Sequence, residues 1–214
     1  MALSRLNYNS LNVTPTASKG IGFDSGADDL AATFSGGAMT FISKFTSDGS
    51  DTTATFASGI DSTYKEYLFI LNNIHPETDN QELTVGFRDG STAYDAIKTT
   101  TYFRAYHDEA GTATSLEYTS GGDLAQGTGN QRISDDLGNG NDECCSGYLH
   151  LFNPSSTTFV KHFIARSNTY HSSDYSVDVY TAGYCNVTAA IDGVQFAMSS
   201  GEIQGGTIQM FGVL

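Results

Sequence analysis

The feature that most constrains the fold of this chain is a series of short stretches in which apolar and polar residues alternate. Near the end of the sequence, Val194, Phe196 and Met198 are separated by single residues and therefore share one face. Successive side chains of a β-strand point to opposite faces, so a period of two predicts strands that bury one face. Runs rich in Gly, Asn, Asp and Ser separate the stretches, and helical periodicity is almost absent. The pattern favours an all-β protein.

The alternating stretches predict roughly nine to eleven strands. The stretch Tyr67–Leu71 is apolar on both faces, which is typical of a strand in the middle of a sheet. A short strand is expected near Gln131–Leu137, because a structureless segment as long as residues 119–147 would be unusual. The other expected strands are residues 53–58, 64–73, 82–90, 99–108, 114–120, 148–153, 158–167 and 175–184, followed by two closing strands around the connector 199–206.

No helical segments separate these strands, which determines the expected architecture. An antiparallel two-sheet β-sandwich, jelly-roll-like in its connections, is the most economical arrangement. We expect the two closing strands to pair with each other. The last strand is expected to lie inside a sheet and to end at Leu214.

The first 50 residues differ from the remainder in composition. They are small, polar and rich in Gly, with short apolar islands at Gly20–Phe23 and Met39–Phe45. Such a segment cannot bury enough apolar surface to offset the entropy of ordering, so it must pack on something else. We therefore divide the chain into an extended N-terminal arm for attachment, residues 1–50, and a β-sandwich body, residues 51–214.

The charge balance narrows the classes of partner. The 214 residues include 24 acidic and 10 basic side chains, which gives a formal net charge of −14. Nucleic acids and anionic membranes bind clusters of Lys and Arg, and the sequence contains none. It also lacks an apolar run of signal-peptide length at its start and any stretch long enough to span a membrane. We expect no nucleic-acid partner, no membrane insertion, and synthesis and retention in a cytoplasm.

The sequence contains no recognised catalytic or cofactor motif. Its five histidines are dispersed, and no spacing typical of a zinc site occurs. His150 and His162 lie on neighbouring predicted strands and could form a metal pair, although ordinary surface or core histidines are the commoner outcome. The acidic segment 135–143 resembles a calcium loop in composition but lacks the ligand spacing of one. We predict no enzymatic activity, no catalytic residue, no metal site and no cofactor.

Three cysteines are present, the adjacent pair Cys144–Cys145 and Cys185. An odd number without framework spacing does not indicate a disulfide scaffold, so we expect free thiols. Adjacent cysteines can form a strained vicinal disulfide. A redox role is disfavoured, because no neighbouring positive charge would stabilise a thiolate in this acidic segment.

Aromatic residues are the candidate contacts for a ligand. The chain has 12 Tyr and 13 Phe but no Trp, and most of the Phe positions alternate inward as core residues. Tyr170, Tyr175 and Tyr184 lie beside loop-like residues instead. We select these three tyrosines as candidate ligand contacts, because an exposed aromatic ring offers a face on which a sugar can stack.

Several turn and strand motifs resemble those of a family of structural proteins in tailed-phage virions, above all in marine phages that infect cyanobacteria and related bacteria. The matching motifs are the turn His75–Asp79 after a tyrosine-rich strand, Asn153-Pro154 at a strand end, and the closing groups Gly193–Phe196, Ser200-Gly201 and Phe211–Val213. The resemblance covers roughly residues 55 to 214. It does not extend to the pair Cys144–Cys145.

The resemblance implies a non-enzymatic structural component of a virion that is assembled in the host cytoplasm. We expect a module of a tail fibre or surface appendage that is anchored by the N-terminal arm. Its expected partners are other virion proteins and further copies of itself, with a trimer preferred, because the arm and the sheet edges need partners. Two alternatives stay open: a decoration protein on the capsid exterior, and a carbohydrate-binding module that contacts a host surface glycan.

Overall fold

A computed structural model describes residues 19–23, 30–35 and 38–213 of the chain. These residues form fourteen β-strands and contain no helix, so the prediction of an all-β protein is confirmed. The strands are β1 (Lys19–Phe23), β2 (Leu30–Ser35), β3 (Met39–Thr46), β4 (Ala54–Phe56), β5 (Glu66–Pro76), β6 (Leu83–Arg88), β7 (Lys98–Asp108), β8 (Thr114–Tyr118), β9 (Gln131–Arg132), β10 (Cys145–Phe152), β11 (Lys161–His171), β12 (Tyr175–Cys185), β13 (Gly193–Met198) and β14 (Ile203–Val213).

The chain divides into two compact units, residues 1–40 and residues 41–214. In the first unit β1 and β2 form an antiparallel pair, with Lys19 opposite Ser35. The rest of the expected arm as far as residue 37 lies outside the described residues. Residues 41–50, which the composition assigned to the arm, belong to the second unit. The reason is that β3 hydrogen-bonds to β14 as an edge strand of the body.

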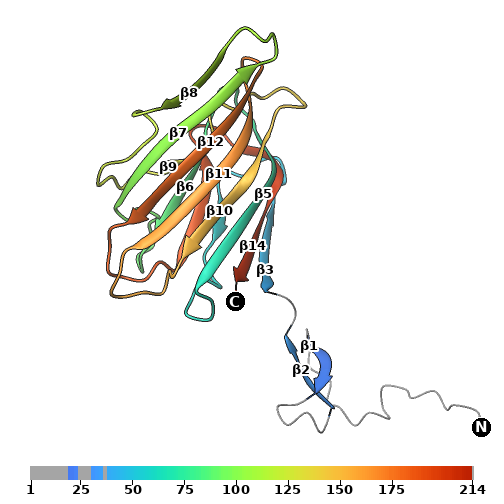
Figure 1. The fold of residues 1–214 in the computed structure, drawn as a ribbon, viewed down its shortest axis with the longest axis vertical. Coiled ribbons are helices and arrows are strands. Elements are labelled where there is room, and N and C mark those ends of the chain that lie inside the picture. The colour runs from blue at the N-terminus through green and yellow to red at the C-terminus, as the bar shows by residue number, and fades with distance from the viewer. Residues whose placement is uncertain (1–18, 24–29, 36–37, 214) are drawn as a thin grey trace, which may run out of the picture. The chain divides into compact units, whose positions relative to one another are not determined.

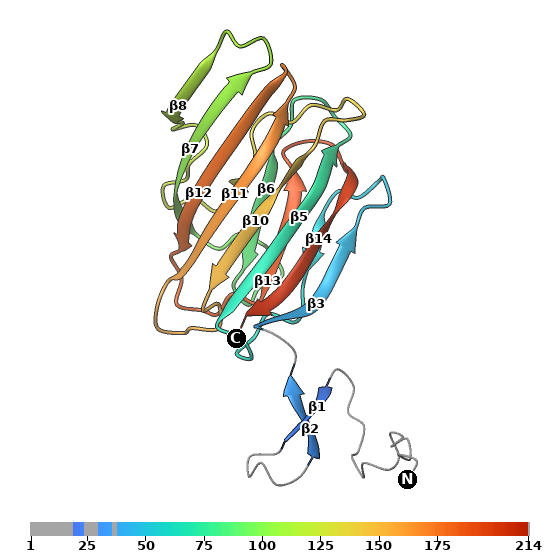
Figure 2. The same cartoon turned by 45° about the vertical axis from the view of Figure 1, so that its right-hand side comes forward.

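Two antiparallel sheets build the second unit. The larger sheet has eight strands in the order β3-β14-β5-β10-β11-β12-β7-β8, and the smaller has four in the order β4-β13-β6-β9. Figure 1 shows the larger sheet from β8 to β3, and Figure 2 shows β6 and β13 behind it. The doubly apolar stretch 67–71 lies in β5, between β14 and β10, so its predicted position in the middle of a sheet is confirmed.

The prediction that the two closing strands pair with each other is wrong. β13 lies between β4 and β6 in the smaller sheet, whereas β14 lies between β3 and β5 in the larger one. The connector is also shorter than expected, because β14 already begins at Ile203. Alternation in the sequence specifies which face of a strand is buried, but not which strand lies beside it. The expectation that the last strand lies inside a sheet is confirmed.

Side chains of both sheets contribute to one hydrophobic core. Phe69 of β5 packs edge-on against Phe56 of β4 and Phe196 of β13, with ring centroids 5.2 and 5.6 Å apart. Phe87 of β6 contacts Phe163 of β11 at 4.7 Å. All five rings are almost fully buried, so burial of apolar surface holds the smaller sheet against one face of the larger.

The other face of the larger sheet carries a row of aromatic residues and one arginine across five strands. Strand pairing aligns the row in the order Tyr118, Phe103, Tyr180, Arg166, Tyr148. The rings of Phe103 and Tyr180 stack in parallel at 4.8 Å, and the Arg166 guanidinium lies 4.7 Å from the Tyr180 ring centroid. We call this set the outer aromatic row. Its residues Tyr118, Phe103 and Tyr148 are 56%, 37% and 38% exposed.

Candidate ligand-binding cavity

The larger sheet extends beyond the smaller one on the side of β12, β7 and β8. The smaller sheet ends at β9, and the chain that follows β9 crosses the inner face of this extension. Three bonds hold that segment in place: the hydroxyls of Ser167, Thr181 and Tyr102 donate to the carbonyl oxygens of Ile133, Arg132 and Ser134 at 2.7, 3.1 and 3.0 Å. The predicted strand at 131–137 is only two residues long. Beyond Arg132 the backbone keeps isolated bonds, such as Ile133 N–H to the Leu83 carbonyl at 2.9 Å, and side-chain hydroxyls supply the others.

The buried carboxylate of Asp135 is the centre of the charged groups on this segment. Its side chain has no exposed area, and both Arg104 and Arg132 donate hydrogen bonds to it. Arg104 also donates through Nε to Glu117 Oε1 at 2.8 Å, and Arg132 to Asp136 Oδ1 at 3.0 Å. A buried carboxylate requires partners of this kind, because the desolvation of an unpaired charge would be very costly.

The charges alter the acidity of the groups beside Asp135. The pKa of Tyr102 is raised above its usual value, chiefly by burial and secondly by the negative charge of the Asp135 carboxylate. Burial alone would lower the pKa of Arg104, but its hydrogen bonds to Glu117 and Asp135 outweigh this effect and raise it. The Tyr102 phenol therefore stays neutral and the Arg104 guanidinium stays charged at neutral pH.

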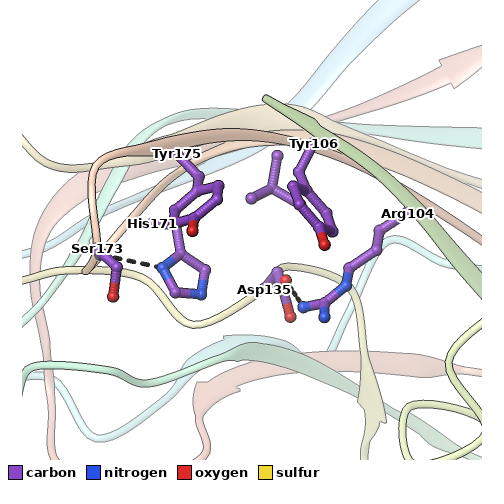
Figure 3. A pocket seen from close by; sticks show the side chains of 7 residues that line it. Arg104, Tyr106, Asp135, His171, Ser173 and Tyr175 are labelled. Atoms are coloured by element: carbon purple, nitrogen blue, oxygen red, sulfur yellow. Dashed lines mark hydrogen bonds and ion pairs between the residues drawn. The ribbon is translucent and has the colours of Figure 1, made fainter. Parts of the chain in front are cut away.

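A cavity of about 270 Å³ opens beside this ion cluster. Its polar and aromatic lining consists of Arg104, Tyr106, Asp135, His171, Ser173 and Tyr175, as Figure 3 shows. The Tyr175 ring lies 5.5 Å from the Tyr106 ring at an interplanar angle of 81°. It lies 5.5 Å from the His171 ring at 66°. We call this space the Tyr175 cavity.

Both ring nitrogens of His171 have neighbours. The Ser173 backbone N–H donates to Nδ1 at 3.1 Å, so Nδ1 accepts and the proton of the neutral ring resides on Nε2. Nε2 lies 3.6 Å from Asp136 Oδ2. Because the backbone N–H of Ser173 occupies Nδ1, His171 is not arranged as a general base for the hydroxyl of that serine.

A second cavity, of about 410 Å³, lies against the opposite face of the larger sheet, because strand alternation directs the side chains of His107, Asn168 and Ser176 away from those of Tyr106 and Val177. Tyr170 also lines it. Interaction with Glu109 is the largest cause that raises the pKa of Tyr170 to about 12. The Thr169 side chain is fully buried, and its hydroxyl has no hydrogen-bond partner among the described residues. This hydroxyl lies on the inner face of the sheet, in register with Val177, and not in the second cavity.

The structure does not bring the three selected tyrosines together. Tyr170 lies opposite Ser176 in the strand register, so its side chain points to the other face of the sheet from that of Tyr175. Tyr184 lies near the other end of β12, roughly 30 Å from Tyr175 at the rise of a strand, and packs against His162 at 5.9 Å. Tyr184 therefore takes no part in this site.

Sequence reasoning missed Arg104, Tyr106, Asp135 and His171. One signal was available, because Arg104 interrupts the aromatic strand "TYFRAY", where a charged residue on a buried face needs a partner. No local pattern linked it to Asp135, which is 31 positions later in the sequence.

The histidines considered as a metal pair do not face each other. His150 lies opposite Ile164, and His162 lies opposite Tyr184. Among the described residues no group of three or more His, Cys, Asp or Glu side chains could hold a metal ion. Asp135, in the segment that resembles a calcium loop, is paired with the two arginines instead.

All three cysteines are free thiols, as expected, and the adjacent pair forms no disulfide. Cys185 lies between the buried lysines Lys98 and Lys161 in the strand register. Burial raises the pKa of Cys185 to about 12, although both lysines act in the opposite sense. The lysine ammonium groups bond to loop carbonyls, for example Lys98 to Gly129 at 2.8 Å and Lys161 to Val187 at 2.7 Å. A thiol in this setting is protonated and unreactive at neutral pH.

No protein-family model, curated protein or solved structure matches this chain. Within the described residues, no helix is long and apolar enough to cross a membrane.

Proposed function

We propose that the protein is a non-enzymatic structural component of a tailed-phage virion. In this proposal the second unit is a jelly-roll β-sandwich, displayed on a tail fibre or surface appendage and anchored through the N-terminal segment. Its location is the virion, and its partners are other virion proteins and further copies of the chain.

The strand order is the observation that carries the proposal. Without β7, β8, β11 and β12, the sheets read β3-β14-β5-β10 and β4-β13-β6-β9. Numbered one to eight along the chain, these strands have the orders 1-8-3-6 and 2-7-4-5, which is the double Greek key of a jelly roll. Jelly rolls are the fold of many viral capsid and lectin domains. The other four strands are then two insertions that widen one sheet.

The motifs that resemble the phage family occupy structural positions in this body. Pro76 is the last residue of β5, and Gly193–Phe196 begins β13. Asn153 has a left-handed backbone with φ 45° and donates its N–H to the Lys65 carbonyl at 2.5 Å, which ends β10. These residues specify turns and strand ends, so the resemblance supports a shared scaffold.

Self-association is part of the proposal, with a trimer as the preferred assembly. The outer aromatic row exposes Tyr118, Phe103 and Tyr148 on one sheet face, and neighbouring Ile164 is 46% exposed. Exposed apolar patches of this kind commonly mark protein–protein contacts. Size-exclusion chromatography with light scattering should give about three times the chain mass of 22.8 kDa. A 22.8 kDa particle at every concentration would contradict it.

Localisation on purified particles tests the virion role. An antibody raised against the purified protein should label virions of the phage that encodes the chain, at the tail or its fibres. Labelling across the head, together with hundreds of copies per particle by quantitative mass spectrometry, would instead identify the protein as a capsid decoration protein. A chain that is abundant in infected cells but missing from purified virions would contradict both.

A further inference from the structure

We infer that the Tyr175 cavity is a binding site for a neutral saccharide, with one sugar ring in the cavity itself. This function goes beyond the structural role proposed above and does not depend on it. The charge balance of the cavity, the orientation of its rings and its volume all favour such a ligand.

The charge balance excludes an anionic ligand. The guanidinium groups of Arg104 and Arg132 are matched by the carboxylates of Asp135, Glu117 and Asp136, all within hydrogen-bonding or ion-pair distance. Carboxylates thus outnumber guanidiniums, and no positive charge is left for a phosphate or a uronate. Binding an anion here would juxtapose like charges without compensation.

A cationic ligand is disfavoured for a different reason. Two tyrosines beside carboxylates can form an aromatic cage for an ammonium group. Here the guanidinium of Arg104 already lies 5.6 Å from the Tyr106 ring centroid and occupies the cation position on that ring. A second cation would lie beside it and be repelled. A neutral polar ligand remains.

The remaining groups match the chemistry of a sugar. Figure 3 shows the hydroxyls of Tyr106 and Tyr175 directed into the same space as the His171 ring and Arg104. Tyrosine hydroxyls both donate and accept, and guanidinium groups donate, so each can bond to a sugar hydroxyl, which does both. The rings of Tyr106 and His171 are inclined to the Tyr175 ring at 81° and 66°, so neither ring stacks in parallel on the face of Tyr175. That face can receive the C–H side of a sugar ring.

The outer aromatic row provides a contrast that sharpens this inference. Its rings Phe103 and Tyr180 are parallel within 3° and stack on each other, and Arg166 covers the next position. Each of these two rings therefore covers one face of the other, which removes that face from a ligand.

Cavity size limits the ligand. A volume of 270 Å³ lies below the range of about 300–1,000 Å³ that encloses drug-sized molecules. It suits a single sugar ring.

Saturation-transfer NMR on the full chain tests the inference. The probes are methyl glycosides of glucose, galactose, mannose, fucose, rhamnose and N-acetylglucosamine, with glucuronate and choline as charged controls. At millimolar concentrations at least one neutral glycoside should show saturable transfer, and the charged controls should not. Tyr175→Ala should weaken that binding about tenfold through loss of the stacking face. The matched variant Tyr184→Ala, at the far end of the same strand, should bind like wild type.

Each result decides the inference. If no neutral glycoside binds, if only a charged probe binds, or if Tyr175→Ala binds as well as Tyr184→Ala, the inference is overturned. Should Tyr175→Ala fail to fold, Ser173→Tyr serves instead, because Ser173 is an exposed turn residue whose enlargement narrows the cavity without emptying the core. That variant should lose binding and keep the wild-type melting temperature. None of these readouts depends on whether the chain is found on a virion.

Discussion

At the scale of single residues, the close approach of β10 to β11 at Gly147 is a stringent packing constraint. A Cβ atom at this position would overlap the Arg166 carbonyl oxygen and lie 2.7 Å from Ser167 Cα. Both are backbone atoms in a paired strand and cannot move aside cheaply. Gly147→Ala should therefore lower the free energy of unfolding by about 1–3 kcal/mol, read as a lower urea midpoint at unchanged slope. Gly121→Ala, where no atom lies within 4 Å, is the control and should change it little. Equal midpoints for the two variants would contradict the predicted strand contact.

Asp136 links the segment over the cavity to the pH dependence of stability. Hydrogen bonding with His171 is the largest cause that lowers its pKa to about 2, and Arg132 assists against the opposing effect of burial. The pKa in the folded protein thus lies below the usual aspartate value of 3.8. The ionised carboxylate therefore stabilises the fold above about pH 4, and this contribution is lost as the pH falls toward 2.

Replacement of this carboxylate should show the same dependence. Asp136→Asn should melt at a lower temperature than wild type at pH 7, and the difference should shrink between about pH 4 and pH 2. The exposed residue Asp142 provides the control, because Asp142→Asn should follow the wild-type curve throughout. A difference at pH 7 that persists unchanged to pH 2 would show that the charge of Asp136 is not its cause.

Sequence reasoning found part of the candidate site and could not find the rest. Tyr175 was identifiable because it begins a strand directly after a turn. Arg104, Asp135 and His171 come from β7, the segment after β9 and the end of β11. These three residues lie close together only because the larger sheet extends beyond the smaller one. That is a property of strand order, which a local period of two does not contain.

At the scale of elements, β14 is the strand whose loss should matter most. It lies between β3 and β5, and its residues Ile208 and Met210 are fully buried in the shared core. Removal of residues 209–214 would expose the edge of β5 and empty part of the core. We predict an insoluble product on expression. Met210→Asp should have the same effect, whereas Gln209→Asp, on the other face of the strand, should stay soluble. A soluble truncation that melts cooperatively would refute the prediction.

The strands themselves were largely predictable, and their partners were not. Alternation identified β5, β7, β10, β11 and β12 within a few residues. The pairing of the closing strands was predicted wrongly, because a connector of a few residues can lead either to a hairpin or to the opposite sheet. β13 and β14 take the second route. Which route the chain takes depends on which sheet has an open position between two of its strands. That position is set by strands far away in the sequence.

At the scale of the whole molecule, residues 41–214 should fold independently of what precedes them. The hydrophobic core and both sheets lie in this unit, except for the first two residues of β3. A chain that begins at residue 41 should melt in one transition within about 4 °C of the full protein, a difference of roughly 1 kcal/mol. Differential scanning calorimetry measures this directly. An insoluble or non-cooperative fragment would show that residues 1–40 are part of the folding unit.

We propose that this chain is a virion component with a jelly-roll body. Cryo-electron microscopy of the phage particle that encodes it is the decisive measurement, because one map gives location, copy number and strand order. We expect density on the tail or its fibres, in threefold groups, that traces the orders β3-β14-β5-β10 and β4-β13-β6-β9. A fully interpreted particle map in which no density fits this chain would refute the virion role.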